Sequence, residues 1–525
     1  MSNLERLQKY IILAMVLLAV ILAAAVFALV TGGEGPQAEP APTAAGELTE
    51  VKWNYPDHLV LGHKLTNQTF ALPDGKKTTL ENHLGENLTL AVYWGSWCSY
   101  CEEQTELLCS LADTLEAQNV KVLLIDKLDP EKESLEAAKS KIQKENIPFD
   151  WIVDSDLSVY RELGLHIIPT SFLLDPDGKV LFCKAGRIQS QEELASILDY
   201  AKLGPAAQTE AFVTKTLMNA DGGVRLHVEP QSGAHPRGQD VLSESQGLIM
   251  EYAALTGNTD LFQKAYGYVQ SNLSEEGLLR WYGSSDGEPG QVNALLDDLR
   301  VLRALDSVAG YETEVFYRAQ ALARGNLDKD GNLVDFYTFS DGSQAHRLSM
   351  CYADFRALDI LARQAPQCAQ AVEKARDLVE GAYLGDDFPF YANFYDYETG
   401  RYDEGSLNMA EAMLTLLHQA EAGQLKETSL TWLKTAMAGE GIWARYDTKG
   451  NVVPGYMYQS AAVYALVGLI AREVEDETLL TQAVSRMEQY RCFRKGSDLD
   501  GAFASSMEEV SSFDQCVALV LYAKL

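Results

Sequence analysis

The sequence NLTLAVYWGSWCSYC at residues 87–101 carries the strongest structural signal in the chain. Its first part is apolar and rich in strand-forming residues, and the residues that follow, EEQTELLCSLADTL, have a helical period. A helix that opens with Cys-x-x-Cys offers unpaired N–H groups and a partial positive charge, which favour the thiolate of Cys98. Cys101, one turn later, can resolve a mixed disulfide. The pattern therefore predicts a thiol–disulfide site.

Strand-like and helix-like segments continue to alternate to about residue 202. Residues 164–186, GLHIIPTSFLLDPDGKVLFCKAG, place Ile168-Pro169-Thr170 before a strand and a DPDG turn, where a cis Pro169 would face the thiols. The alternative is half of a structural zinc site or a buried disulfide. Zinc needs a second Cys-x-x-Cys or a closely spaced Cys/His pair, and the sequence has neither. Cys109 and Cys183 are expected to be buried packing residues or a second pair.

These features resemble the membrane-anchored TlpA/ResA-like branch of the thioredoxin superfamily, over about residues 59–202. The resemblance rests on WCxxC, on a Gly-x-x-x-x-Pro-Thr segment and on an Asp-x-x-Gly turn. It implies that Cys98 is the nucleophile, Cys101 the resolving thiol and Pro169 a cis proline.

The chain departs from these relatives beside the thiols. Relatives often carry an acidic residue three positions after the second cysteine and a proline after it, where this sequence has Gln104 and Thr105. Glu102 or Glu103 is the expected substitute for the missing acid.

Residues 10–30, YIILAMVLLAVILAAAVFALV, contain no charge and no proline. A helix of this length crosses the ~30 Å hydrocarbon core of a bilayer. Arg6 and Lys9 precede it, so the positive-inside rule places everything after the helix outside the cytoplasm. A cleaved signal peptide is the alternative, but its apolar run is typically ~7–15 residues long. The sequence favours a membrane anchor.

The chain is expected to divide into five parts. These are a cytoplasmic tail (1–9), a transmembrane anchor (10–31), a Gly-, Pro-, Ala- and Glu-rich linker (32–50), a thioredoxin-like domain (51–203) and a helical domain (204–525). The 525 residues are 47% hydrophobic and 22% charged, which is globular composition and excludes a disordered protein. The net charge of −32 argues against a nucleic-acid partner, which needs a basic surface.

Amphipathic helices replace the strands from about residue 204. Segments with a 3.6-residue apolar period begin near residues 242, 292, 350, 407, 457 and 513, and each except the last is followed by a second helix. A sixth hairpin forms if the helix near residues 211–218 pairs with the C-terminal one. Six hairpins closed into a ring make an (α/α)6 barrel. The predicted fold class is therefore multidomain: a transmembrane helix, an α/β thioredoxin-like fold and an all-α (α/α)6 barrel.

The long connections between hairpins are aromatic and are expected to gather where the inner helices begin. Flat rings beside Asp and Glu suit a sugar, which offers an apolar C–H face and a rim of hydroxyls. Rings that only cap the barrel core are the alternative. The candidate sugar-binding residues are Trp281, Tyr282, Tyr337, Phe394, Tyr395, Tyr397 and Trp443.

Carboxylates recur at the same end of the predicted barrel. Those at or just before inner-helix starts are Glu244, Asp297, Asp298, Asp354, Asp403 and Glu404. Inverting cleavage of a glycosidic bond uses two carboxyl groups ~6.5–9.5 Å apart. A helix N-terminus lowers a carboxyl pKa, so a general acid there needs burial or a like-charged neighbour. Each of these residues has the alternative role of a helix cap.

The helical region resembles glycoside hydrolase family 8, in particular its branch associated with bacterial exopolysaccharide, over about residues 211–525. SESQGLIMEYAALTGNTDLF, residues 243–262, matches the segment with the general acid and implies that role for Glu244. NALLDDLRVLRAL, residues 293–305, matches the segment with the acidic pair of the substrate site.

That second segment departs from the family. The usual Ser/Thr-Asp-Ala/Gly-Asp is Leu295-Leu296-Asp297-Asp298 here, so Asp298 inherits sugar binding and Leu296 replaces the first acid. The general base is expected from a later hairpin, and Asp403 is the first choice, followed by Glu404 and Asp354.

The sequence predicts a membrane-anchored extracytoplasmic protein that combines thiol–disulfide exchange with inverting hydrolysis of β-linked glycosidic bonds in an exopolysaccharide. One alternative is a non-catalytic polysaccharide-binding barrel that serves the thiol domain. The other is an epimerase-like barrel fused to a thioredoxin domain. No cofactor and no metal are expected.

The expected partners are a polysaccharide, extracytoplasmic protein thiols and disulfides, a membrane electron carrier and the membrane itself. Within the barrel, Cys351 with Cys368 and Cys492 with Cys516 are candidate targets of the thiol pair.

Overall fold

The computed structural model describes residues 62, 64–65, 67–228, 238–284, 287–504 and 510–525. The predicted anchor (10–31) and linker (32–50) lie outside the described residues. Within the described ranges, the helices are all too short or too polar to cross a bilayer.

The first domain is built on one mixed sheet. In the described part of the chain it has seven strands in the order β2-β1-β5-β4-β3-β6-β7. The central pairs β3–β4 and β4–β5 are parallel, and β6 runs antiparallel to β3. The strands are β1 (Thr69–Ala71), β2 (Lys77–Thr79), β3 (Leu88–Trp94), β4 (Val120–Lys127), β5 (Asp150–Asp154), β6 (Thr170–Leu174) and β7 (Val180–Ala185).

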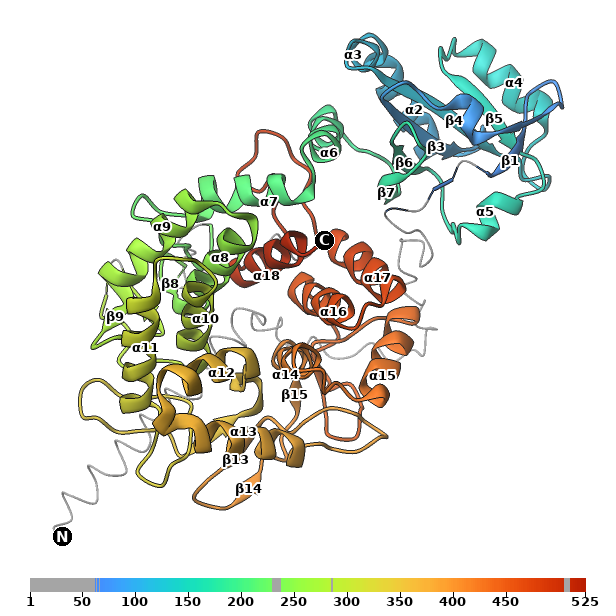
Figure 1. Cartoon of the computed structure of the whole chain (residues 1–525). Coiled ribbons are helices and arrows are strands. Elements are labelled where there is room, and N and C mark those ends of the chain that lie inside the picture. The colour runs from blue at the N-terminus through green and yellow to red at the C-terminus, as the bar shows by residue number, and fades with distance from the viewer. Residues whose placement is uncertain (1–61, 63, 66, 229–237, 285–286, 505–509) are drawn as a thin grey trace, which may run out of the picture.

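Helices cover both faces of this sheet (Figure 1). All seven residues of β3 are buried, as expected for a strand between two helical layers. Helices α2 and α6 pack on the face that carries Trp94, and α5 packs on the face that carries Tyr93. The helices of this domain are α2 (Ser99–Ser110), α3 (Ala112–Ala117), α4 (Leu135–Lys144), α5 (Ser158–Glu162) and α6 (Gln191–Leu203).

The second domain is a ring of helical hairpins. Among the described residues, six inner helices pack side by side in a closed circle, and the C-terminal helix α18 returns to the first, α8. The inner helices are α8 (Ser243–Thr256), α10 (Leu295–Asp306), α12 (Phe355–Gln364), α14 (Met409–Glu421), α16 (Ala461–Glu473) and α18 (Ser512–Ala523). The outer helices are α9 (Thr259–Tyr268), α11 (Glu312–Gly325), α13 (Ala369–Gly381), α15 (Glu427–Ala438), α17 (Glu477–Glu488) and α7 (Pro205–Phe212). Helix α7 packs on α18, so the predicted sixth hairpin joins both ends of the domain.

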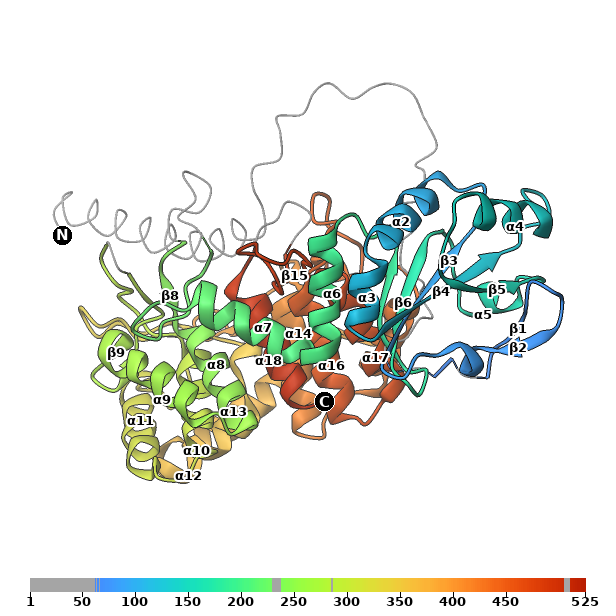
Figure 2. The ribbon, with the colours of Figure 1, turned by 90° about the horizontal axis from the view of Figure 1, so that it is seen from above.

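Short strands in the long connections mark the end of the ring where inner helices begin (Figure 2). They pair across neighbouring connections: β8 (Val241–Leu242) with β11 (Tyr282–Gly283), and β15 (Leu407–Asn408) with β16 (Arg445–Tyr446). A third small sheet contains β12 (Arg347–Ser349), β13 (Phe394–Asp396) and β14 (Arg401–Tyr402).

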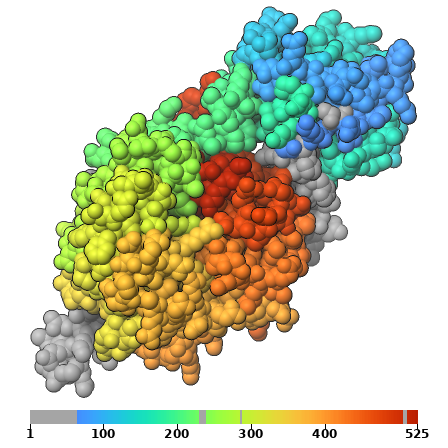
Figure 3. Space-filling view, in the orientation of Figure 1, coloured from blue at the N-terminus to red at the C-terminus, as the bar shows by residue number. Residues whose placement is uncertain are grey.

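The two domains are in direct contact. Phe493, from the connection after α17, packs edge-on against Phe182 and Tyr200, with ring centroids 5.0 and 5.6 Å away. Lys495 forms an ion pair with Asp199 on α6 at 2.7 Å. The space-filling view shows the first domain in contact with the ring (Figure 3).

Candidate functional site

The thiol pair lies where β3 passes into α2. Cys98 is the N-cap of α2, and its Sγ accepts a hydrogen bond from the N–H of Cys101 at 3.2 Å. The two cysteines form a disulfide. Cys98 is 8% exposed and Cys101 is 1% exposed, so Cys98 is the sulfur open to attack.

The peptide bond between Ile168 and Pro169 is cis, as the sequence predicts. The Sγ atom of Cys98 lies 3.6 Å from the carbonyl oxygen of Ile168. Trp97 and Tyr100 flank the pair and are 37% and 61% exposed. A substrate backbone can therefore meet Cys98 between these rings and the Ile168 carbonyl.

Gln104 is buried beside the pair. Its Nε2 donates to the hydroxyl of Ser171 at 2.8 Å, and its Oε1 accepts from the N–H of Ile188 at 2.9 Å. Both ends of this amide are thus satisfied by the protein, and it ties α2 to β6 and to the segment that follows β7.

Glu102 and Glu103 point away from the thiols. Glu102 forms an exposed ion pair with Lys141 at 2.9 Å, and Glu103 pairs with Arg187. The expectation that one of them replaces the missing acid is therefore wrong, because both helix positions face solvent.

In the ring, Glu244 and Asp297 share one arginine. Arg300 Nη1 lies 3.3 Å from Glu244 Oε1 and 3.4 Å from Asp297 Oδ1. Asp297 also accepts from the hydroxyl of Ser243 at 2.6 Å. Gly247 permits this approach of α8 and α10, because a Cβ there would lie 3.0 Å from the Arg300 Cβ. The side chains of Glu244, Asp297 and Arg300 are 21%, 11% and 6% exposed.

The burial of these carboxyls changes their protonation. Burial raises the pKa of Glu244, although Arg300 acts in the opposite direction. For Asp297, burial and then the charge of Glu244 raise the pKa to about 7. Two adjacent buried carboxylates resist double ionisation, so the pair retains a proton near neutral pH.

A further carboxylate comes from the opposite side of the ring. Glu411 is the third residue of α14, which is three places from α8 in the circle of inner helices. Burial raises the pKa of Glu411, while Arg445 and Arg347 lower it and Glu244 raises it. Glu244 and Glu411 are therefore close enough to feel each other's charge across the ring axis.

Comparison with known proteins gives matches for both domains. Residues 61–182 match the AhpC/TSA family. The thiol-disulfide oxidoreductase ResA of Bacillus thuringiensis is 27% identical over 142 residues, which are 27% of this chain and 79% of ResA. The match includes the cysteine pair and the cis proline. This part of the chain is a thioredoxin-like domain of the AhpC/TSA family.

The barrel has relatives of its own. A solved α-amylase from Clostridium perfringens is 25% identical with a TM-score of 0.56, over 61% of this chain and 97% of that one. Endoglucanase Cel10 of Klebsiella pneumoniae, a family 8 glycosyl hydrolase, matches at 13% identity and a TM-score of 0.42, over 53% and 96% of the two chains. The putative lipoprotein YdaJ of Bacillus subtilis is 24% identical over 351 residues, which are 65% of this chain and 92% of YdaJ. The predicted resemblance to glycoside hydrolases is confirmed at the level of the fold.

Asp298 has a structural part in the barrel. Its Oδ1 accepts from the N–H of Leu279 at 3.0 Å, and its Oδ2 accepts from Asn293 at 2.9 Å. The side chain is buried, and burial raises its pKa to about 8. Both oxygens of Asp298 therefore hold donors of the barrel, as both oxygens of Asp297 do, and Asp298 is the more buried of the two, at 2% exposed against 8%. Leu296 belongs to the barrel core.

Asp403 follows β14 in the connection that leads to α14. Its backbone N–H donates to Phe394 and its carboxylate accepts from Asn393. Glu404, beside it, is exposed. Asp403 and Glu404 therefore both belong to the connection that precedes α14.

The expectation that Asp354 lies with the other carboxylates is wrong. It caps α12 through a 3.0 Å bond from the N–H of Ala357, and it binds Arg303 at 3.0 Å. Arg303 also binds Glu421, the last residue of α14. Asp354 thus lies towards the end of the ring where the inner helices finish. The reason is that the turn at Met350–Tyr352 precedes α12, so this helix begins further along the ring axis than its neighbours do.

The candidate aromatic residues divide into two groups. The Trp281 carbonyl accepts from Ser243, and Tyr282 pairs in register with Leu242, so the segment that carries these two rings runs beside the start of α8, where Glu244 lies. Four of the other expected residues are part-buried and pack on the barrel core, which fits the capping alternative; these are Tyr337, Tyr395, Tyr397 and Trp443. Phe394 is part-buried under the guanidinium of Arg347, which lies 4.7 Å from the centre of its ring.

Sequence reasoning missed Arg300, Glu411 and Asp335. Asp335 is buried and accepts from Arg347 Nε at 2.9 Å and from the N–H of Ser349 at 2.6 Å. A usable signal for Glu411 was its register: Glu244, Asp297 and Glu411 each occupy the second or third position of an inner helix.

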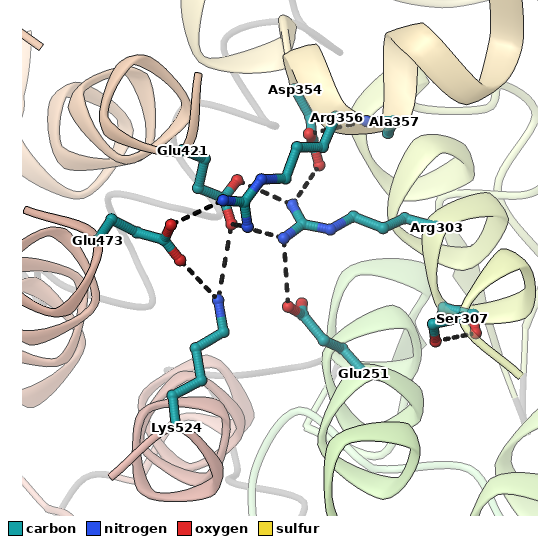
Figure 4. A network of polar contacts seen from close by, with 10 residues as sticks. Glu251, Arg303, Ser307, Asp354, Arg356, Ala357, Glu421, Glu473 and Lys524 are labelled. Carbon is teal, nitrogen blue, oxygen red and sulfur yellow. Dashed lines mark hydrogen bonds and ion pairs between the residues drawn. The ribbon is translucent and has the colours of Figure 1, made fainter. Parts of the chain in front are cut away.

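An ion-pair network closes the other end of the ring (Figure 4). Arg303 donates to both oxygens of Glu421, at 2.5 and 2.9 Å, and Lys524 lies 3.6 Å from the same carboxylate. Asp354, His418 and Glu421 offer ligand-type atoms within 4.8 Å of one another. The Arg303 cation already binds two of these three groups, so this cluster is better described as an ion-pair network than as a metal site.

Cys109, Cys351, Cys368 and Cys516 are free thiols in the structure. Cys351, Cys368 and Cys516 are buried, and burial raises the pKa of each thiol. A buried neutral thiol is a poor nucleophile, which makes these residues unfavourable targets for the thioredoxin-like domain in the folded barrel.

Proposed function

We propose that this protein combines thiol–disulfide exchange at Cys98 and Cys101 with inverting hydrolysis of glycosidic bonds in a polysaccharide. The observation that carries the second activity is the convergence of Glu244, Asp297 and Glu411 at one end of the ring. Two carboxyl groups in different protonation states are what inverting cleavage requires.

Glu244 is the proposed general acid. Burial raises its pKa, and the adjacent Asp297 is a second buried carboxyl that contacts the same arginine. Glu411, on the opposite inner helix, replaces Asp403 as the proposed general base that activates water. Trp281 and Tyr282, beside Glu244, are the proposed sugar contacts.

We expect Glu411→Gln to lower hydrolysis by about 10²–10³-fold, since a base contributes on that order. Asp403→Asn is the matched control and should retain activity within about twofold. Initial rates of hydrolysis of a soluble polymer, with polymer binding measured separately, show whether Glu411 or Asp403 is the general base. If only Asp403→Asn loses activity, the general base is Asp403, in the connection before α14, and not Glu411.

The proposed substrate has either β-linked or α-linked sugars. The sequence favours a β-linked exopolysaccharide, whereas the solved relative from Clostridium perfringens is described as an α-amylase. A screen of β-1,4-glucan, α-1,4-glucan and the host's own polymer, with reducing ends counted, separates these substrates.

A binding module is the second candidate, favoured by the 3.3 Å contact of Arg300 with Glu244. A permanent ion pair would keep this carboxylate ionised and unable to donate a proton. Polymer binding without new reducing ends, unchanged in Glu244→Gln, would select this function.

For the thioredoxin-like domain, we expect Cys98→Ser to abolish dithiol-dependent reduction of a disulfide probe. Cys101→Ser should instead trap a mixed disulfide on Cys98, because the resolving thiol is missing. Mass spectrometry of the full chain after exposure to glutathione disulfide measures both results. A Cys98→Ser variant that still reduces the probe would refute the assignment of the nucleophile.

We place both domains outside the cytoplasm, held by the apolar segment at residues 10–30. The description of the relative YdaJ as a putative lipoprotein supports a membrane-attached location. The proposed partners there are protein thiols and disulfides, with a membrane electron carrier to supply reducing equivalents.

A further inference from the structure

A buried carboxyl pair, Asp126 and Glu133, lies beside the thiol site. Asp126 is fully buried near the end of β4, where its register neighbour is Trp94. Alternate residues of a strand share a face, so Asp126 points the same way as Leu124. That face is the one on which the thiol pair is packed.

Glu133 follows β4 and returns to the turn before Cys98. Its Oε2 accepts from the N–H of Ser96 at 3.2 Å and also from the Ser96 hydroxyl. A Cβ on Gly95 would lie 3.1 Å from Glu133 Oε1 and 3.2 Å from Ile168, so the carboxyl occupies space that this glycine leaves open. The Gly95 carbonyl in turn accepts from the N–H of Cys98 at 3.1 Å. Glu133 therefore contacts the turn that positions the nucleophile.

The two carboxyls are arranged to share a proton. Within the described residues, no nitrogen or hydroxyl donates to either oxygen of Asp126 or to Glu133 Oε1. Burial first, and then the charge and contact of Glu133, raise the pKa of Asp126 to about 8. A proton held between the carboxyls satisfies these oxygens and removes one of two repelling charges.

Other charged groups around β4 face elsewhere. Asp154 is on the opposite face of the sheet, where the Tyr93 hydroxyl donates to it at 3.3 Å. Lys127 lies over the ring of Tyr160, and Lys132 lies over the ring of Trp97. Glu102 and Glu103, on the adjacent helix α2, are paired with Lys141 and Arg187 at the surface.

We propose that the Asp126–Glu133 pair stores the proton that Cys101 takes up when its disulfide with Cys98 is opened. This rests on the proposed exchange activity. An incoming thiolate attacks Cys98 Sγ, the bond between Cys98 and Cys101 breaks, and its electron pair goes to Cys101 Sγ. The proton then passes from the carboxyl pair to that sulfur, directly or through one water. A second thiolate of the external dithiol releases Cys98, so two electrons move from the dithiol to the protein.

The test is the rate at which dithiothreitol reduces the disulfide in the full chain, measured by acid quench and mass-tagged alkylation from pH 6 to 9.5. Rates are divided by the thiolate fraction of the reductant. For the unchanged protein, this normalised rate should fall as pH rises through about 8, where the pair loses its proton. In Asp126→Asn it should be about tenfold lower at pH 7 and independent of pH in this range.

Glu133→Gln gives a second test, since it removes the shared charge from a part-exposed position and does not depend on a buried substitution. It should shift the pH at which the normalised rate falls. Glu103→Gln, an exposed acid on the adjacent helix, should behave as the unchanged protein. The proposed proton store is wrong if the normalised rates of all three variants stay within twofold of each other at every pH. Circular dichroism checks that each variant is folded. A disulfide that dithiothreitol cannot open at any pH would instead refute the exchange activity.

Discussion

Glu244→Gln is expected to lower glycosidic cleavage by about 10³-fold, because the amide cannot donate a proton to the leaving oxygen. Glutamine keeps the size of the side chain and can still contact Arg300, so polymer binding should change little. The measurement is the rate of reducing-end formation on the polymer that the unchanged protein cleaves best. Thiol–disulfide exchange by the same variant is the internal control for folding of the chain.

The pH profile tests the same residue independently. Burial raises the pKa of Glu244, and burial together with the Glu244 charge raises the pKa of Asp297 to about 7. The protonated acid is the active form, so hydrolysis should decline as pH rises through the raised pKa of Glu244. Equal activity at pH 6 and pH 9, or full activity in Glu244→Gln, would exclude Glu244 as the general acid.

Arg303→Met is expected to destabilise the barrel by about 3–5 kcal/mol, the cost of leaving buried charges without a partner. Arg303 donates to Asp354 and to both oxygens of Glu421, whose side chains are 3% and 2% exposed. Urea unfolding followed by circular dichroism measures the effect. Arg356→Met is the matched control, because Arg356 contacts Glu421 and Glu473 from a position that is 43% exposed. Its cost should be about 0–1 kcal/mol.

The effect of Arg303 should depend on pH with a defined sign. Burial raises the pKa of Asp354, but Arg303 and then His418 outweigh it and leave the pKa lowered. A carboxyl with a lowered folded-state pKa contributes stability above its unfolded pKa of about 3.9 and loses it as pH falls below that value. The difference between Arg303→Met and the unchanged protein should therefore shrink in acid. Equal costs for Arg303→Met and Arg356→Met at neutral pH would show that the network does not hold the ring together.

The thiol site could be predicted because its parts are close in sequence. Strand, turn, Cys-x-x-Cys and helix occupy residues 88–110, and each has a local signal. The cis Pro169 also follows from a local motif before β6. The substitute acid could not be predicted, because Glu102 and Glu103 are on a solvent-facing side of α2 whose partners, Lys141 and Arg187, come from later elements.

The barrel could be predicted as a set of hairpins, because apolar residues at a helical period mark each inner helix. Its carboxylates were harder to place. Asp354 has the sequence context of an inner-helix start, yet α12 begins lower in the ring, and its carboxylate meets Arg303 there. Glu411 was overlooked because its local sequence resembles that of an ordinary first-turn acid, and only its register, shared with Glu244 and Asp297, distinguishes it.

The sequence by itself determined the two fold types, the cysteine pair and the cis proline, since these depend on short-range patterns of apolar residues, cysteine and proline. Only the tertiary structure decided which charged groups meet. Glu244, Arg300 and Glu411 are separated by up to 167 residues (411 − 244), and the closed circle of six inner helices brings them to one end. Asp126 and Glu133 meet the thiol turn in the same way, because the pairing of β3 with β4 fixes which residues lie beside Cys98.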